Sequence, residues 1–512
     1  MERHQADILG VLSGFDRVLF RGTLRTISFV DGARKFLAAS RILLKDFAAF
    51  AQGCTDEIAR HAEHIAEQAG RPYVYLTSST ERKDDHAREI AGRDGIERGL
   101  VCVLYAVEPC MGFDIRRNRE EKKLQLVSRQ RKCRFFYFYF MDRDFGLMHV
   151  RLQSWFPFEV QVCLNGRSYL AKQMDREGIA YTQRRNCFPF IENLPRAQQL
   201  LDQLSRRNWA KTLSVLAERA NPLLATRLCN VHRYYWTLRQ SEYATDVLFK
   251  DKASLDALYP SLWQHAMKHF EPPDILRFLG KKMTRAMAGE ALTDVKRRAE
   301  GLRIKHTIDG NSIKMYNKEG SVLRVETTIN NPRPFRVLRK VPREGGPALA
   351  WLPMRRGVCD TARRVEVSLA ANGRYLDALS VIGEETPSHR ILDSVSKPVT
   401  KDGQAYRALR PISPDDALLF QAILRGEHLV HGFSNSQIRG HLFPAAAKDP
   451  NQRRRRSALI SRKLRLLRAH GLIRKLPRRR LYRTTPKGHE VMTTALRFRQ
   501  TDIRLLKLTD AA

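Results

Sequence analysis

The sequence predicts an α+β protein with a central antiparallel sheet, flanking helices and a separate basic domain at its C-terminal end. Three observations lead to this prediction. Apolar residues recur at helical spacing near both ends of the chain, strand-like runs with tight turns occur in the middle, and positive charge is concentrated in the last sixty residues. Antiparallel strands joined by short turns, with helices before and after them, are typical of this class.

Composition indicates the kind of partner. The chain has 512 residues, a hydrophobic content of 43% and a formal net charge of +37. The length suggests roughly two to four domains, and the charge favours a polyanion, DNA before RNA. A membrane partner is not expected, because no apolar run approaches the roughly 18–20 residues of a membrane span. The polar N-terminus lacks a signal-peptide core, so we expect a cytoplasmic protein associated with nucleic acid.

The cysteines favour reduced thiols over a zinc site. All eight are dispersed along the chain, and no Cys-x-x-Cys pair occurs among them. Structural zinc sites usually draw two of their ligands from such a pair.

Hydrophobic periodicity divides the chain into four regions. We expect a mainly helical N-terminal region at 1–90, with helices at 33–50 and 55–70 and a strand or tight turn at 15–22. A central α+β domain follows at 91–340, with a helical insertion at about 190–300. A connecting region and linker at 341–410 leads into the basic domain at 411–512.

The strands of the central domain follow from apolar and aromatic runs that are bounded by turn residues. Helices are expected at 167–177 and near 373–381. Asp309-Gly310 is a hairpin signal, and Asp142 and Asp144 are interpreted as turn residues. The expected strands are 100–105, 133–140, 147–155, 158–164, 303–308, 312–316 and 322–329.

The aromatic strand at 133–140 allows two interpretations. With the flanking bases Arg131, Lys132 and Arg134, an open aromatic face would be a stacking platform for single-stranded nucleic acid. Alternatively, the strand is central and buried on both faces. Burial is favoured, because six consecutive aromatic residues show no polar alternation.

The segment from 311 to 326 is the strongest candidate for chemistry. Strand alternation places Lys314, Tyr316 and Lys318 on one face, and a tight turn brings Arg324 and Glu326 opposite them. A tyrosine oxygen can attack phosphorus and hold a broken strand covalently. The bases would offset charge on the phosphoryl oxygens, and the carboxylate could hold a divalent metal.

The same segment resembles a known family. Tyr316-Asn317-Lys318, followed by Arg324-Val325-Glu326, is similar to the Tyr-Asn/Asp-Lys … Arg-x-Glu stretch of rolling-circle replication initiators of plasmids and filamentous phages. The resemblance covers about 25 residues. It implies a DNA-nicking and joining enzyme of a mobile element or replicon, with Tyr316 as nucleophile and Glu326 as a ligand of Mg²⁺ or Mn²⁺.

Further metal ligands are expected outside this segment. These initiators are related to endonucleases with a His-hydrophobe-His triplet, which this sequence lacks. The nearest substitute is the alternating set His149, Arg151 and Gln153, from which His149 and Gln153 are candidate ligands. His306, before the Asp-Gly turn, is a further candidate.

The basic domain resembles a winged helix-turn-helix, a fold of many bacterial regulators and replication proteins. Helices expected from 413, at 434–443 and at 449–470 precede two short strands and a last helix. From 451 to 510 there are 19 Lys and Arg residues against three acids. In this fold the third helix enters the major groove, and the tip between the strands lies against phosphate. The expected nucleic-acid contacts are Arg453, Arg454, Arg455, Arg456, Arg462, Lys463, Arg465 and Arg468 on the helix, and Arg478, Arg479 and Arg480 at the tip.

Two functions therefore remain open. One is a metal-dependent tyrosine nuclease. The other is a non-catalytic DNA- or RNA-binding protein, either a regulator that binds paired half-sites as a homodimer or a component of a nucleoprotein complex. A nuclease is expected to expose Tyr316 beside metal-binding side chains, whereas a regulator is expected to bury it.

Overall fold

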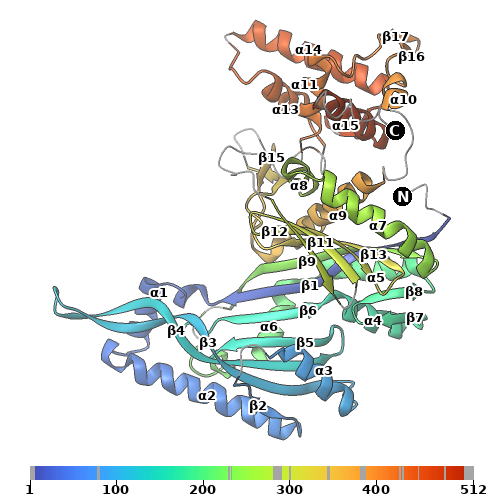
Figure 1. Cartoon of the computed structure of the whole chain (residues 1–512). Coiled ribbons are helices and arrows are strands. Elements are labelled where there is room, and N and C mark those ends of the chain that lie inside the picture. Colours follow the sequence, from blue (N-terminus) through green and yellow to red (C-terminus); the bar gives the residue numbers. More distant parts are fainter. Residues whose placement is uncertain are drawn as a thin grey trace.

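A computed structural model describes residues 6–77, 81–228, 231, 233–280, 291–298, 301–342, 346, 348–380, 388–425, 428, 432–447, 449–477 and 480–500. Within these residues the fold is α+β, around an 11-stranded sheet (Figure 1). In spatial order the strands are β10 (Leu292–Arg298), β11 (Gly301–Ile308), β12 (Asn311–Lys318), β13 (Val322–Ile329), β9 (Tyr235–Phe249), β1 (Ile8–Thr23), β6 (Val160–Asn165), β5 (Gly146–Gln153), β4 (Lys123–Asp142), β3 (Gly99–Asn118) and β2 (Tyr73–Tyr75).

The sheet is mixed rather than purely antiparallel as the sequence suggested. Its neighbouring strands are antiparallel except at one edge, where β2 runs parallel to β3. The sheet also has two halves with the same strand order. From the centre outward, one half reads β1, β6, β5, β4, β3 and the other reads β9, β13, β12, β11, β10. In each half the first strand in sequence lies at the centre and is paired with the last, so the central β1–β9 pair joins two topologically equivalent units.

Helices pack against the sheet, and over its second half they cover one face and leave the opposite face polar. Over the second half, Ile313, Met315 and Val325 pack into one core with Tyr259 and Tyr375 from two of the helices. The helices are α1 (Val30–Ala39), α2 (Phe47–Gln68), α3 (Lys83–Arg93), α4 (Gly166–Glu177), α5 (Leu194–Arg206), α6 (Trp209–Glu218), α7 (Lys252–His269), α8 (Pro272–Phe278) and α9 (Thr361–Leu379). Because side chains alternate along a strand, Lys314, Tyr316 and Glu326 point to the opposite face.

Two of the expected regions are rearranged in the fold. Residues 1–90 do contain α1, α2 and α3, but they also supply β1, which lies at the middle of the sheet. The stretch at 190–300 was expected to be a helical insertion, yet it contains β9, the other central strand. Both strands carry charged residues on the polar face of the sheet, and these interrupt the apolar pattern by which a buried strand is usually identified.

The strand and helix predictions of the central domain are largely confirmed. The expected strands at 100–105, 133–140, 303–308, 312–316 and 322–329 lie within β3, β4, β11, β12 and β13. The helix expected at 167–177 is α4, which Asn165 caps by accepting hydrogen bonds from the backbone of Arg167 and Ser168. The helix expected near 373–381 begins earlier, at Thr361.

The aromatic strand is a core element. All six side chains from Phe135 to Phe140 are at most 8% exposed. Burial on both faces, the favoured interpretation, is therefore confirmed. The alternative, an aromatic platform that stacks against nucleic-acid bases, does not fit these exposures.

The C-terminal part has a hydrophobic core of its own and lies apart from the sheet, beyond α8 and α9 (Figure 1). Its elements are α10 (Ser388–Asp393), β16 (Val399–Lys401), β17 (Gln404–Tyr406), α11 (Pro414–Ile423), α13 (Asn435–Leu442), α14 (Pro450–Ala469), β18 (Ile473–Lys475), β19 (Tyr482–Thr484) and α15 (Pro486–Gln500). Two further hairpins are β7 (Tyr181–Arg184) with β8 (Cys187–Ile191), and β14 (Arg336–Val341) with β15 (Ala348–Pro353). In the described residues, no helix has the length and apolar character needed to cross a membrane.

His306 is buried beneath the helices, and its burial makes the stability of the fold sensitive to acid. Its ring is fully buried against Thr293 and Tyr375, and burial lowers the pKa of His306 to about 4. This folded-state pKa lies below the unfolded value of about 6.5. The contribution of the neutral His306 ring to the free energy of unfolding is therefore complete above pH 6.5 and is lost as the pH falls through 4. We expect this residue alone to reduce the free energy of unfolding by roughly 3 kcal/mol between pH 7 and pH 4.

The check is chemical unfolding of the wild type and His306→Gln across this pH range. The variant keeps a neutral polar side chain, so its unfolding free energy is expected to fall less steeply with acid. Equal slopes for the two proteins would contradict this assignment.

Candidate active site

Two tight turns set the register of the site hairpins. Asp309-Gly310 joins β11 to β12 with positive φ at both residues, as a type I′ turn requires. Glu319, Gly320 and Ser321 join β12 to β13, with positive φ at Glu319 and Gly320. The resulting register pairs Lys314 with Glu326 and Tyr316 with Arg324. The prediction that these polar side chains face one another across one ladder is therefore confirmed.

Three carboxylates converge beside this ladder on the polar face. Asp16 of β1, Glu242 of β9 and Glu326 of β13 each offer an oxygen within 4.8 Å of the others. Asp16 occupies a β-bulge, because β1 and β9 pair Phe15 with Tyr243 and Arg17 with Glu242, which leaves Asp16 as the extra residue. Bulges commonly redirect a side chain next to a functional site. The carboxylate cluster thus lies at the junction of the two halves of the sheet.

Tyr316 contacts this cluster directly. Its hydroxyl donates a hydrogen bond of 2.9 Å to Glu326 Oε2, while Lys314 Nζ lies 2.7 Å from Glu326 Oε1. The ammonium of Lys318 lies 5.6 Å from the centre of the Tyr316 ring. The tyrosine side chain is only 7% exposed. Burial and the charge of Glu326 raise its pKa well above the usual value.

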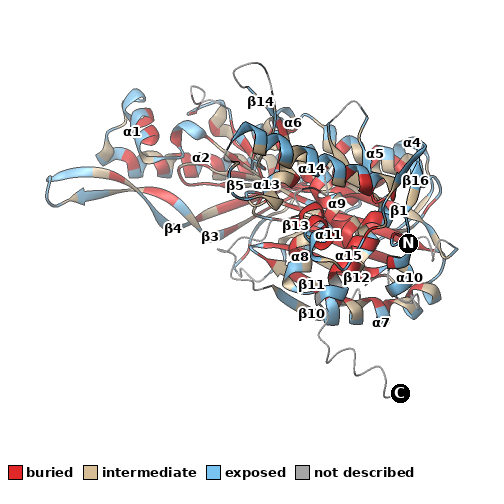
Figure 2. Ribbon diagram, turned by 90° about the horizontal axis from the view of Figure 1, so that it is seen from above, coloured by how far each residue is buried: buried red, intermediate tan, exposed pale blue. Residues whose placement is uncertain are grey.

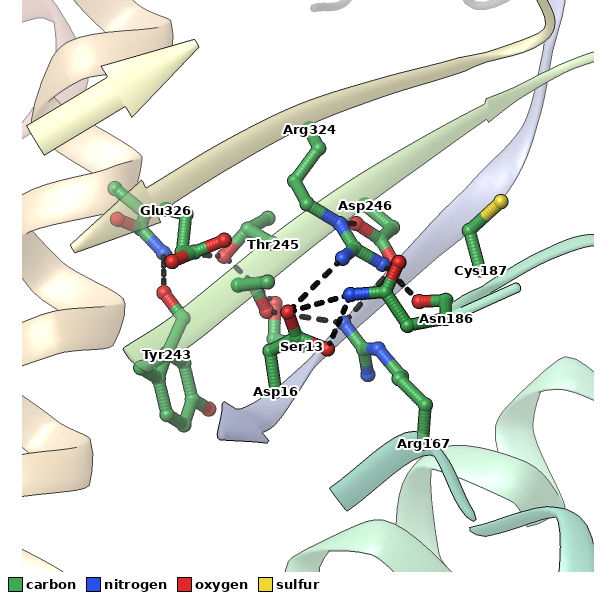
Figure 3. Close-up of polar contacts among 12 residues, drawn as sticks. Ser13, Asp16, Arg167, Asn186, Cys187, Tyr243, Thr245, Asp246, Arg324 and Glu326 are labelled. Atoms are coloured by element: carbon green, nitrogen blue, oxygen red, sulfur yellow. Dashed lines mark hydrogen bonds and ion pairs between the residues drawn. The ribbon is translucent and has the colours of Figure 1, made fainter. Parts of the chain in front are cut away.

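Arg324 anchors the cluster. Its buried guanidinium donates two hydrogen bonds to Asp246, at 2.5 and 2.8 Å, and lies 3.3 Å from Asp16 (Figure 3). Arg167, at the start of α4, contacts Asp246 at 2.9 Å, and Asn186 donates its amide to both oxygens of Asp16. The sequence predicts that Arg324, with the lysines, offsets charge on phosphoryl oxygens. Its donors instead hold Asp246 and Asp16, so it is a positioning residue.

Electrostatics make the cluster suitable for a cation. Burial, followed by the charges of Glu326 and Asp16, raises the pKa of Glu242 to about 7. Glu242 is half-buried and Arg17 beside it is exposed, so the cluster is open to solvent on that side. Three carboxylate oxygens form a donor set for hard cations such as Mg²⁺ or Mn²⁺. The donor set therefore fits the expected metal.

The structure contradicts two of the three metal ligands expected from the sequence. His149 and Gln153 are on β5, four strand spacings from Glu326 on β13, or about 19 Å at about 4.8 Å per strand. His149 lies 3.5 Å from Asp84, and Gln153 donates to backbone carbonyls of Met111 and Trp155. His306, the further candidate, faces the helical layer instead of the cluster. Of the expected ligands, only Glu326 belongs to the cluster.

Sequence reasoning missed Asp16 and Glu242. Each is an acid within an otherwise strand-like run, and each lies far from the 311–326 segment in the sequence. For Asp16, an acid beside the apolar run at 18–20 is a signal, because a carboxylate is rarely buried without a partner. Glu242 follows the polar residues at 239–241, and its local sequence carries no such signal.

The expected nucleic-acid contacts are mostly on the surface. On α14, Arg453, Arg454, Arg455, Arg462, Arg465 and Arg468 are exposed, whereas Arg456 and Lys463 are half-buried. Arg480 is exposed, and Arg478 and Arg479 lie outside the described residues. Near the aromatic strand, Lys132 is exposed, Arg131 stacks on Trp155 and Arg134 pairs with Asp56.

Comparisons with protein-family models, curated proteins and solved structures found no match to this chain.

Proposed function

We propose that the protein is a metal-dependent nuclease that nicks and joins one DNA strand through Tyr316. The observation that carries this proposal is the hydrogen bond from the Tyr316 hydroxyl to Glu326, one of the three clustered carboxylates. A nucleophile, a proton acceptor and a potential metal site thus meet on one sheet surface. The resemblance of the 311–326 segment to rolling-circle initiators supports the same chemistry.

Tyr316 and Glu326 would carry out the cleavage step together. The oxygen of Tyr316 forms a bond to phosphorus as its proton passes to Glu326, the hydrogen-bond acceptor. The bond from phosphorus to the leaving deoxyribose oxygen breaks, and this oxygen takes up a proton from solvent. The strand is then held as a phosphotyrosine ester, and a free hydroxyl end can reverse the step and join the strand.

The carboxylate cluster would hold the metal through Asp16, Glu242 and Glu326. When bound, a divalent cation supplies positive charge that offsets charge on the phosphoryl oxygens. Lys314 adds positive charge at the same place. Burial disfavours its charged form, but Glu326 and Glu242 outweigh this effect and raise the pKa of Lys314, so the ammonium is retained.

The C-terminal part would deliver the enzyme to DNA. Its order of helix, helix, long basic helix, two short strands and last helix supports the winged-helix assignment. Exposed arginines on α14 would contact phosphates, so binding is expected to weaken strongly with salt.

The test is a covalent-adduct assay. Wild type and Tyr316→Phe are incubated with Mn²⁺ and labelled single-stranded oligonucleotides that tile the DNA around the gene, then separated on a denaturing gel. We expect an adduct with the wild type only, since the phenyl ring has no attacking oxygen. An adduct of equal yield with the variant would exclude Tyr316 as nucleophile.

A non-catalytic nucleic-acid-binding protein is the second candidate. The low exposure of Tyr316 favours it, because a nucleophile must reach its phosphate. Absence of any adduct, with salt-sensitive binding retained in both proteins, would support this function. The carboxylate cluster favours the nuclease, because its three oxygens lie within 4.8 Å of one another and form a donor set for a divalent cation.

A further inference from the structure

A long two-stranded arm projects from the edge of the sheet. The strand β4 pairs with β5 only from Phe135 onward, so residues 107–118 and 123–134 form a two-stranded ladder. Backbone hydrogen bonds from Phe113 to Phe156 and from Ser154 to Arg134 join the base of this ladder to the rest of the domain. Twelve residues per strand correspond to about 40 Å at about 3.3 Å per residue. In Figures 1 and 2 this arm extends away from the rest of the molecule, and its tip is exposed.

The arm is fixed at its base. Trp155 donates its indole N–H to the backbone of Phe113 at 2.9 Å, and Gln153 donates to the backbone of Met111 at 3.2 Å. The guanidinium of Arg131 lies 3.5 Å from the centre of the Trp155 ring. At the tip, the side chain of Asn118 accepts a hydrogen bond from the backbone of Glu120. Isolated hairpins are only marginally stable, so these contacts explain how the arm keeps its shape.

The arm is strongly basic. Residues 107–134 contain nine Lys and Arg residues against four acids. One of the acids, Asp114, is paired with Arg129. Seven of the bases are exposed: Arg116, Arg117, Arg119, Lys122, Lys123, Arg129 and Lys132. Like charges crowded on a narrow ribbon repel one another, and a polyanion along the ribbon would offset this repulsion.

The shape and side chains of the arm fit a duplex better than a single strand. The major groove of B-DNA admits a two-stranded β-ribbon. Proteins that bind single strands without sequence preference stack the bases on aromatic side chains. Residues 114–134 contain no aromatic residue, and the two that flank them, Phe113 and Phe135, are each buried at 2% exposure.

We infer that this arm binds double-stranded DNA flanking the cleavage site, through phosphate contacts along the ribbon. The choice of DNA rests on the proposed function. The base of the arm, on β4, is six strand spacings from β12, which carries Tyr316, or about 29 Å at about 4.8 Å per strand, and the arm extends further from there. The arm would therefore contact duplex DNA at a distance from the strand that Tyr316 cuts.

The test compares two variants in which four exposed bases become glutamine. The arm variant changes Arg116, Arg117, Lys123 and Lys132, and the control variant changes Arg184, Arg206, Lys211 and Lys268 on other elements. Binding of labelled duplex DNA is measured by fluorescence anisotropy at several salt concentrations. Matching circular-dichroism spectra establish that both variants fold.

We expect the arm variant to bind duplex DNA at least about tenfold more weakly than the control variant. Each lost phosphate contact reduces the slope of log K against log salt by about 0.9, so four contacts reduce it by up to about 3.6. Equal affinities and slopes for the two variants, or no duplex binding by the wild type, would overturn the inference. So would weaker binding to anionic phospholipid vesicles with unchanged duplex binding.

This measurement involves no cleavage and is repeated in the Tyr316→Phe background. Weaker duplex binding by the arm variant, together with the absence of any covalent adduct with the wild type, would support DNA binding by the arm and contradict the proposed nuclease activity. Unchanged duplex binding by the arm variant, together with an adduct formed by the wild type, would support the nuclease activity and contradict DNA binding by the arm.

Discussion

Replacing Asp246 by alanine is expected to destabilise the fold by about 3–5 kcal/mol, the cost of leaving a buried charge without its partner. Asp246 is 1% exposed and receives hydrogen bonds from Arg324 and a contact from Arg167, both of which are fully buried. Burial disfavours the carboxylate form, but Arg167 and Arg324 outweigh it and lower the pKa of Asp246. Without this acid, two guanidinium groups would remain in the interior with one acidic neighbour, Asp16.

The measurement is chemical unfolding followed by circular dichroism. The matched control is Asp114→Ala, which removes a partly exposed partner of Arg129 in the arm. Such exposed pairs contribute at most about 1 kcal/mol. If the two variants lose the same free energy of unfolding, the ion pairs of Asp246 with Arg324 and Arg167 do not stabilise the sheet.

Replacing Glu242 by glutamine is expected to abolish the response to metal while the fold is kept. A ligand that binds only the folded state at about 100 times its Kd stabilises that state by about 2.7 kcal/mol. We expect Mn²⁺ to raise the melting temperature of the wild type and to have no such effect on Glu242→Gln. Adduct formation is expected to fall at least about 100-fold, since metal assistance contributes several kcal/mol and each 1.4 kcal/mol is tenfold.

Without metal, the same variant is expected to be at least as stable as the wild type at pH 8. The pKa of Glu242 is about 7 in the fold, above the ordinary value, so the ionised acid disfavours folding above pH 7. Glutamine carries no charge and therefore removes this loss of stability. The matched control is Glu108→Gln, which changes an acid paired with Arg151 and Lys83 elsewhere on the sheet. An unchanged metal response in Glu242→Gln would contradict the proposed metal site.

The local parts of the site were predictable from the sequence because they depend on neighbours in the chain. Asp-Gly and Glu-Gly turns determine the register of β11, β12 and β13, and alternation then puts Tyr316 and Glu326 on one face. The helix expected at 167–177 was likewise predicted from its local sequence, and it is α4. These features require only turn geometry and strand periodicity.

The other parts of the site and of the fold depend on pairing between strands that are far apart in the sequence. Asp16 and Glu242 are separated by more than 220 residues in the sequence, and they meet only because β1 and β9 pair at the centre of the sheet. The same pairing shows why His149 is a poor partner for Glu326. His149 has suitable chemistry, but three strands lie between β5 and β13. The repeated topology of the two halves also escaped detection, because it is a similarity of strand order rather than of residues.

The most direct test of the proposed tyrosine nuclease is the position of the covalent bond between protein and DNA. Wild-type adduct is digested with protease and nuclease, and the peptide that carries the nucleotide is identified by mass spectrometry. The proposed mechanism predicts a phosphodiester linkage to Tyr316, formed only when Mn²⁺ or Mg²⁺ is present. A nucleotide on any other residue, or the same linkage in metal-free buffer, would contradict it.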